Sequence, residues 1–125
     1  MASKRPTKAA VQRRVKYWKP RLMLHHWNLS VVFDPDTEDG SEASCNASPE
    51  YLNAVLRFDL NLIPPAEMDS YIVHEMLHCS IWPLANCAHS MCGEDAAKLE
   101  SVRVHEEALA TCLERIIIGL TEGAA

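Results

Sequence analysis

The sequence carries a His-Glu-x-x-His pattern at residues 74–78, in which His74 and His78 flank Glu75. On a helix, residues four positions apart project from the same face, so both histidines could offer a ring nitrogen to one metal ion. Glu75 lies about 100° further round such a helix, where its carboxylate would reach a water molecule beside the metal. Neutral imidazole is a good zinc ligand, and zinc lowers the pKa of a coordinated water to about 7. The pattern therefore predicts a zinc site with His74 and His78 as ligands and Glu75 as the general base.

The residues around this pattern predict that its helix is buried. Apolar side chains occupy nearly every side of it: Ile72, Val73, Met76, Leu77 and Ile81. Two histidines and a glutamate inside a buried helix are unfavourable unless they have partners, and one metal ion with its water would supply a partner to all three. The alternative, a chance pattern on a surface helix, fits these neighbours less well.

The third ligand is expected from the last helix, predicted over 94–120. Its apolar stripe comprises Leu99, Val102, Leu109, Leu113, Ile117 and Leu120. At about 100° per residue, Glu106 falls about 30° from the centre of this stripe, whereas Glu107 falls about 130° away. Glu107 would thus share the solvent side with Thr111 and Glu114. Because a carboxylate that faces the core needs a partner, we predict Glu106 as the third ligand. The alternative is that Glu106 bonds a basic residue at the edge of the core.

Other histidines and cysteines offer further arrangements. His89, eleven residues beyond the pattern, is the second candidate for the third ligand, as in zincins that use three histidines. His105 could donate a hydrogen bond beside the site, although a histidine at a helix edge is the simpler interpretation. A separate structural zinc site of Cys87, His89 and Cys92 lacks the paired Cys-x-x-Cys knuckles of zinc ribbons and is less favoured.

The elements that would position these residues follow from periodicity and turn signals. A helical stripe of Val11, Val15, Trp18 and Leu22 predicts a helix that Pro20 breaks near Lys19. Strict alternation over 52–62 predicts a strand with one exposed face. Pro64 and Pro65 suit the start of the helix that carries the histidines, and Pro83 is expected to end it.

The expected order of elements is that of a small α+β domain. It runs through a helix, a strand over 27–33, an acidic loop over 34–50 with a short strand at 42–47, the strand over 52–62, the helix over 64–82, a connector over 83–93 and the helix over 94–120. The sheet would be antiparallel or mixed, with about three strands. We expect one domain over 1–125, in which residues 1–10 are a candidate disordered segment.

The bulk composition fits a folded domain. The 125 residues are 48% hydrophobic and 23% charged, and no apolar run approaches the roughly 18 residues of a membrane span. The N-terminus lacks the apolar stretch of a secretory leader. Five cysteines without such a leader indicate reduced thiols, so we expect a cytoplasmic protein. Cys79 and Cys112, on predicted helices, are expected to be small buried apolar residues.

The charge is unevenly distributed along the chain. The net charge is −5, yet eight of the twelve Lys and Arg residues precede Asp34 and all seventeen acids lie at Asp34 or beyond. This asymmetry keeps a nucleic-acid contact through the basic N-terminal helix as an alternative function. The simpler interpretation is a solvated helix face that complements an acidic body.

Several stretches resemble a known family. The segments YIVHEMLHCSIWPL and HEEALATCLERI are similar to the short zinc metallopeptidases of phages and prophages, within the zincin group that also holds gluzincins and SprT-like proteases. YWKPRLMLHHWNLSVVF and EYLNAVLRFDL resemble that family's leading helix, first strand and edge strand. The resemblance implies that His74 and His78 bind zinc, that Glu75 is the base, and that a glutamate of HEEAL is the third ligand. The zinc-ribbon tail of SprT-like proteins is absent here.

These inferences predict a zinc-dependent metallohydrolase, most simply a peptidase acting on a peptide or protein, with strand 52–62 as an edge beside the cleft. His89, His105 and Tyr71 are all candidates for the residue that stabilises the oxyanion, and the sequence does not choose between them. The first alternative is a non-catalytic zinc module that holds two helices together. The second is the nucleic-acid-associated protein.

Overall fold

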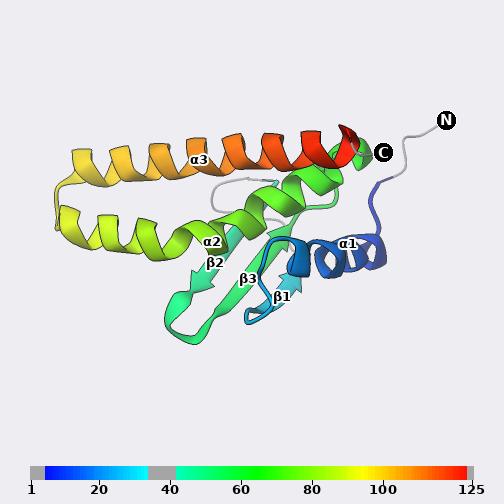
Figure 1. The fold of residues 1–125 in the computed structure, drawn as a ribbon, viewed down its shortest axis with the longest axis horizontal. Helices are drawn as coiled ribbons and strands as arrows, with labels where there is room; N and C mark the ends of the chain where they lie inside the picture. Colours follow the sequence, from blue (N-terminus) through cyan, green and yellow to red (C-terminus); the bar gives the residue numbers. More distant parts are fainter. Residues whose placement is uncertain (1–4, 34–41, 124–125) are drawn as a thin grey trace.

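A computed structural model describes residues 5–33 and 42–123 and shows three helices and a three-stranded sheet. The predicted α+β class is confirmed, including the N-terminal helix and the long C-terminal helix. Helix α2 has the central position, in contact with α1, with α3 and with strands β2 and β3 (Figure 1). The predicted acidic loop at 34–41 lies outside the described residues. In the part of the chain that is described, no helix has the length and apolar character needed to cross a membrane.

Helix α1 (Lys8–Arg21) begins at Thr7, whose hydroxyl accepts a hydrogen bond from the amide of Ala10 at 3.1 Å. Its predicted stripe is buried at Val11, Val15 and Trp18. The helix continues two residues past the predicted end. Pro20 falls in the last turn, where its missing N–H removes a single helical hydrogen bond and the amide of Leu22 still reaches Trp18.

The sheet is mixed and has the order β1-β3-β2. Strand β1 (Asn28–Val32) pairs in parallel with β3 (Asn53–Phe58), and β2 (Ala43–Ser48) pairs with β3 in the antiparallel sense. Ala54, Leu56 and Phe58 face the core, as their alternation predicted. However, the expectation that β3 is an edge strand is wrong, because both of its edges are paired. Alternation reports which face of a strand is buried and carries no information about its edges.

Helix α2 (Met68–Cys92) follows a 3-10 turn, η2 (Pro65–Glu67), and carries the His-Glu-x-x-His pattern. The prediction that it stops at Pro83 is wrong. Pro83 lies on an exposed side of the helix, and the residues beyond it form the part of α2 that packs along α3, with Ala85 buried. This packing offsets the lost backbone hydrogen bond. The helix ends before Gly93, whose φ of +58° is a conformation that favours glycine.

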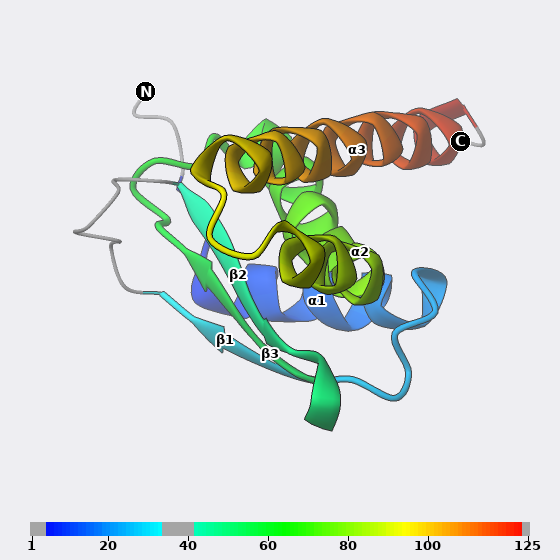
Figure 2. The same cartoon turned by 90° about the vertical axis from the view of Figure 1, so that its left-hand side faces the viewer.

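Helix α3 (Ala96–Gly123) runs back antiparallel to α2 (Figures 1 and 2). The side chain of Asp95 accepts a hydrogen bond from the amide of Lys98 and so begins the helix. Ala110 is the one fully buried residue of α3 among those that the structure describes. Leu109 and Leu120, two members of the predicted stripe, are exposed. The buried face of α3 is therefore rotated about the helix axis relative to the face predicted from its large apolar residues.

An ion pair fastens α1 to the start of α2. The guanidinium of Arg14 donates hydrogen bonds of 2.8 and 2.9 Å to the carboxylate of Asp69, and Trp18 Nε1 donates a third at 3.2 Å. Burial raises the pKa of Asp69, but the hydrogen bonds from Arg14 and Trp18 and the charge of Arg14 outweigh it and leave that pKa below its ordinary value. The contact fixes the first turn of the helix that bears the site.

Candidate metal centre

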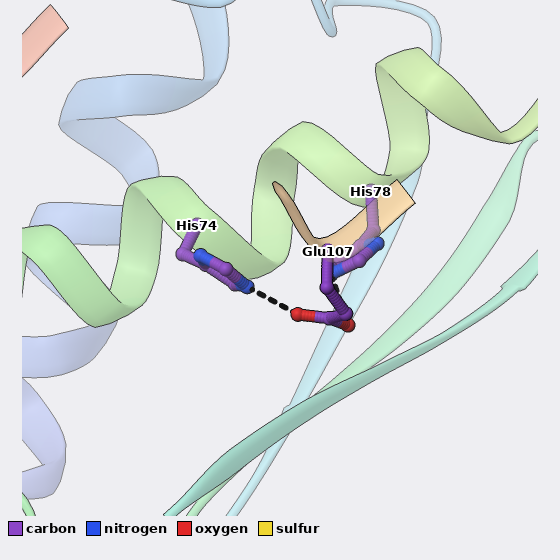
Figure 3. A group of neighbouring side chains, drawn as sticks. All are labelled: His74, His78 and Glu107. Carbon is purple, nitrogen blue, oxygen red and sulfur yellow. Dashed lines mark hydrogen bonds and ion pairs between the residues drawn. The ribbon is translucent and has the colours of Figure 1, made fainter. Parts of the chain in front are cut away.

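Two imidazoles and one carboxylate converge between α2 and α3 (Figure 3). His74 and His78 come from consecutive turns of α2, with ring centroids 5.2 Å apart. Glu107 reaches across from α3, with Oε2 3.1 Å from His74 Nε2 and Oε1 3.2 Å from His78 Nε2. One ligand atom from each of the three residues lies within 4.8 Å of the other two. The described residues thus include a group of three side chains that could hold one metal ion.

This donor set fits a zinc ion. Ligands bound tetrahedrally at 2.0–2.2 Å are separated from one another by about 3.4 Å. The two histidine–glutamate separations are near that value, but each ends on a different oxygen of Glu107, and the three ligand atoms of the group lie within 4.8 Å of one another. The side chains would therefore have to move to share one ion. Two histidines and a glutamate are also the protein ligands of several catalytic zinc sites, which keep a fourth position for water or substrate. The chemistry of the donors therefore fits zinc.

Glu106 faces inward as predicted, but it is not part of this group of three. Its Oε2 lies 2.7 Å from Nδ1 of His78, and its Oε1 lies 3.8 Å from Nε2 of His89. Glu106 does point inward, with a side chain 12% exposed against 49% for Glu107. Yet Glu107, predicted on the solvent side, faces both histidines. The metal group lies at the margin of the helix interface, so the ligand comes from the half-exposed position rather than from the most buried one.

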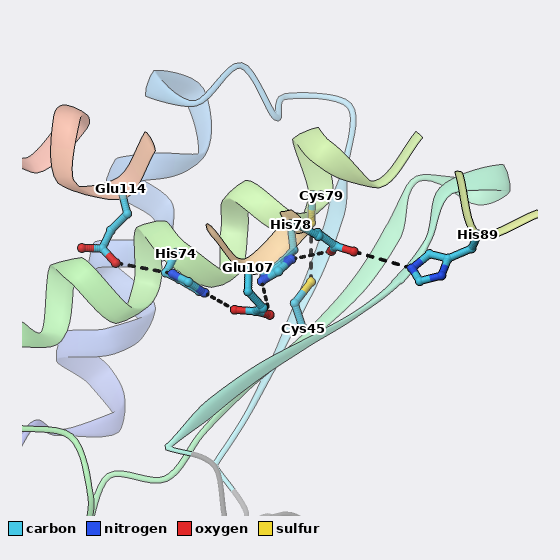
Figure 4. A network of polar contacts seen from close by, with 8 residues as sticks. Cys45, His74, His78, Cys79, His89, Glu107 and Glu114 are labelled. Atoms are coloured by element: carbon cyan, nitrogen blue, oxygen red, sulfur yellow. Dashed lines mark hydrogen bonds and ion pairs between the residues drawn. The ribbon is translucent and has the colours of Figure 1, made fainter. Parts of the chain in front are cut away.

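Glu114 was also predicted on the solvent side and is instead only 16% exposed. Its Oε1 lies 3.4 Å from Nδ1 of His74. Each histidine therefore has a carboxylate of α3 at Nδ1 and shares Glu107 at Nε2, an alternating row seen in Figure 4. A carboxylate at Nδ1 fixes the proton on that nitrogen and leaves Nε2 free for a metal. The sequence analysis gave no weight to Ala110, which is buried on α3. A small residue adds little to an apolar stripe, although it allows helices to pack closely.

Glu75 is buried beside this group. It is 7% exposed and has no hydrogen bond or ion pair to any described residue. Burial raises the pKa of its carboxyl to about 7, an effect opposed by His74 and reinforced by the charge of Glu107. A carboxyl whose pKa lies near neutrality can both take and return a proton. Its position agrees with the predicted role of general base.

Two hollows meet at Glu75 and Glu107. The larger, of about 520 Å³, extends toward the start of α2 and includes Glu42, Glu67, Tyr71 and Arg115. The smaller, of about 350 Å³, lies toward β2 and includes Ser44, Cys45, His78, Arg103 and Glu106. Ala43 lines both. A cleft therefore passes the metal group and is bordered by β2 rather than by β3.

The remaining histidines lie outside the metal group. His89 reaches only Glu106, and its ring lies 6.3 Å from that of Trp82. Nδ1 of His105 donates a 2.6 Å hydrogen bond to the carbonyl of Ser101 one turn earlier, as expected of a histidine at a helix edge. Tyr71, in contrast, lines the larger hollow together with Glu75. Of the three candidate oxyanion stabilisers, Tyr71 is thus the one that shares the cavity with the base.

The cysteines form no second metal site in the part of the chain that is described. All five are free: Cys45, Cys79, Cys87, Cys92 and Cys112. Cys79 is buried as predicted, with its sulfur 3.9 Å from that of Cys45, whereas Cys112 is exposed, contrary to prediction. Cys92 donates a hydrogen bond to the carbonyl of Ala88 within its own helix. The grouping of Cys87, His89 and Cys92 into a structural zinc site is therefore not observed.

The fold and site define an α+β domain whose paired helices carry a His-Glu-x-x-His group and a facing glutamate. The chain matches no protein-family model, no curated protein and no solved structure.

Proposed function

We propose that this protein is a zinc-dependent peptidase of the zincin type, similar to the short metallopeptidases of phages and prophages. The observation that carries the proposal is the position of Glu75, buried and unpaired beside the three converging ligands His74, His78 and Glu107. A structural metal site has no use for an extra buried carboxylate, which is unfavourable without a partner. A hydrolase uses such a group as its base.

Zinc held by His74, His78 and Glu107 would polarise the scissile carbonyl and make a neighbouring water more acidic. Glu75 takes one proton from that water as the water oxygen bonds to the carbonyl carbon. Glu75 then delivers the proton to the amide nitrogen as the carbon–nitrogen bond breaks. The products are a carboxylic acid, which retains the second proton of the water, and an amine. Tyr71, in the same hollow, is placed to donate a hydrogen bond to the carbonyl oxygen during this step.

Two histidines and one carboxylate also hold iron in a class of oxygenases. Glu75 favours zinc here, because hydrolysis needs a base beside the metal whereas oxygen activation needs open metal positions. The five free cysteines are typical of a reducing compartment, and we place the activity in the cytoplasm.

The substrate would lie along β2. This strand borders the cleft through Ala43, Ser44 and Cys45, and among residues 5–33 and 42–123 it pairs with β3 along one edge and with no strand along the other. An extended peptide can add to an open strand edge through backbone hydrogen bonds. Strand β2 therefore takes the role that the sequence assigned to residues 52–62.

The test compares the wild-type protein with Glu75→Gln. Both should bind one zinc ion, measured by elemental analysis. The wild type should cleave a mixed library of internally quenched peptides, lose activity with a chelator and regain it with zinc. Glu75→Gln should lose at least about a hundredfold in kcat/KM, the usual size of a general-base contribution. Glu50→Gln, an exposed glutamate outside both hollows, is the matched control.

A non-catalytic zinc module is the first alternative. It predicts one bound zinc, a melting temperature that falls on chelation, and no cleavage of any peptide by the wild type. That result, obtained with folded and zinc-loaded protein, would contradict the peptidase proposal.

A basic groove favours the second alternative. Arg13, Lys16 and Lys19 line a hollow between α1 and β1, and none of the three has an ion pair with a described residue. Arg14, in contrast, is occupied by Asp69. Nucleic-acid binding through the groove predicts a salt-dependent DNA gel shift that the triple change to glutamine removes, whereas Lys98→Gln on α3 leaves it intact. Without a shift in the wild type, this alternative should be dropped.

A further inference from the structure

We propose that the larger hollow selects a substrate with a positively charged side chain next to the cleaved bond. This inference rests on the proposed peptidase function and specifies its substrate class. The ligand chemistry is that of a lysine or arginine side chain in an extended peptide.

Two glutamates of the hollow are free to bind such a group. Glu42, just before β2, and Glu67, at the start of α2, are exposed and line the hollow. Neither has an ion pair with any described residue. The other acids of the hollow are occupied: Glu107 faces both histidines, and Glu114 faces His74.

The charge of the hollow stays negative even with a metal present. Arg115 is the one cation among its lining residues, against the five glutamates Glu42, Glu67, Glu75, Glu107 and Glu114. A zinc ion adds two positive charges, which offset Glu75 and Glu107. The wall formed by the other lining residues then retains excess negative charge. A cleft lined by one sign of charge concentrates ligands of the opposite sign.

Tyr71 reports this negative environment independently of the metal group. Burial raises the pKa of its phenol, and the charges of Glu42, Glu67 and Glu114 raise it further. These three carboxylates, from three different elements, thus act on one point of the hollow wall. A cationic side chain placed near Tyr71 would contact the phenol ring and the two free glutamates together.

Glu75 shows separately that the hollow is built for a ligand. The residue is only 7% exposed, has no hydrogen bond or ion pair with a described residue and lines this hollow. A buried carboxylate without a partner destabilises the folded protein, and a bound ligand would supply the missing partner. The exposed glutamates Glu42 and Glu67 therefore border a hollow that also holds a buried carboxylate without a partner among the described residues.

The smaller hollow lacks such free acidic side chains, so the positive side chain should bind on one side of the metal group only. Its cation, Arg103, is bound by Glu100 through hydrogen bonds of 3.0 and 2.6 Å. Its acid, Glu106, is held by His78 and lies near His89. No unpaired carboxylate of the described residues lines this side apart from Glu75, which both hollows share. The positive side chain should therefore bind on the side of η2 and the start of α2.

The experiment uses zinc-loaded full-length protein and two series of peptide hydroxamates, in which the zinc-binding group stands at either end of the peptide. Each series carries lysine, norleucine or glutamate as the adjacent residue, and dissociation constants are measured by calorimetry. In one series the lysine compound should bind about tenfold more tightly than the norleucine compound, and the glutamate compound more weakly than both. The lysine advantage should shrink as salt is raised.

The double variant Glu42→Gln with Glu67→Gln should remove the lysine advantage and leave norleucine binding unchanged. The matched control is Glu50→Gln with Glu94→Gln, which changes the net charge equally at exposed positions outside the hollow. This control should keep the advantage. Quenched peptides with the same three residues on either side of the cleaved bond should show the same order in kcat/KM.

The outcomes separate this inference from the proposed function. Equal binding of lysine and norleucine compounds, or an advantage that the double variant keeps, overturns the inference while the peptidase proposal stands. A lysine advantage without cleavage of any peptide supports the cation-selective hollow and contradicts the peptidase. If no hydroxamate binds zinc-loaded protein, the inference fails.

Discussion

The Nδ1 atom of His78 donates a hydrogen bond of 2.7 Å to the carboxylate of Glu106. Because an ionised carboxylate can only accept, this contact would hold a proton on Nδ1 when Nε2, which faces Glu107 at 3.2 Å, binds a metal. Glu106, which the sequence predicted to be a metal ligand, is thus placed to orient the ligand His78. The difference leads to distinct expectations for two adjacent glutamates.

Removal of a proposed ligand should weaken zinc binding far more than removal of a residue that only orients a ligand. His74→Ala and Glu107→Gln should reduce the zinc content of the purified protein to a small fraction, because only two protein ligands remain. Glu106→Gln should keep one zinc with an affinity about 10- to 100-fold lower. His89→Ala, which removes a residue outside the group, is the control. Competition with a fluorescent chelator measures each affinity. Total loss of zinc with Glu106→Gln and none with Glu107→Gln would restore the ligand set predicted from the sequence.

The raised pKa of Glu75 predicts how the stability of the metal-free protein changes with pH. A carboxyl whose pKa rises from 4.5 to about 7 on folding is protonated in both states below pH 4.5 and ionised in both above 7. Its favourable contribution is therefore complete at low pH and is lost as the pH rises through 7. Glu75→Gln does not titrate. The difference in free energy of unfolding, Glu75→Gln minus wild type, should therefore rise by about 3 kcal/mol when the pH is raised from about 4 to about 8.

Urea unfolding with a chelator present gives these free energies. A constant difference across this pH range would show that Glu75 is solvated in solution.

The contact between Arg14 and Asp69 makes the opposite prediction. The pKa of Asp69 is lowered on folding, so its contribution is present above the unfolded pKa of about 3.9 and is lost as the pH falls through the folded value. Asp69→Asn should lower the free energy of unfolding by about 1 kcal/mol at pH 7, since the pair is partly exposed. The loss should shrink as the pH falls below the unfolded pKa and the carboxyl becomes protonated in both states.

A double-mutant cycle with Arg14→Gln checks that the effect belongs to this pair. Additive losses from the two single variants would mean that the ion pair contributes nothing in solution.

Ala110 should control both packing and metal affinity. Ala110→Leu adds three carbons where α3 meets α2 without space, and should reduce the free energy of unfolding by about 1–3 kcal/mol. It should also weaken zinc binding, because Glu107 lies one turn away on the same face of the helix. Leu109→Ala, at an exposed neighbouring position, should change neither property by much. A fully active Ala110→Leu protein would contradict the close helix contact.

The sequence by itself determined the elements that have strong local causes. The stripe of α1, the alternation of β3 and the caps and breaks around the helices are properties of neighbouring residues, and the structure confirms them within a few positions. The spacing of His74 and His78 likewise fixes two side chains on one face of α2, whatever lies opposite. Pro83 is the exception, because packing along α3 overrides a local preference.

Only the tertiary structure decided which residues face one another. The edge role of β2, the choice of Glu107 over Glu106 and the inward position of Glu114 depend on how α3 rotates against α2. The most buried position of α3 among the described residues is Ala110, and hydropathy gives such a small residue little weight. Helix periodicity shows which residues share a face, whereas the shape of the partner determines which face is in contact.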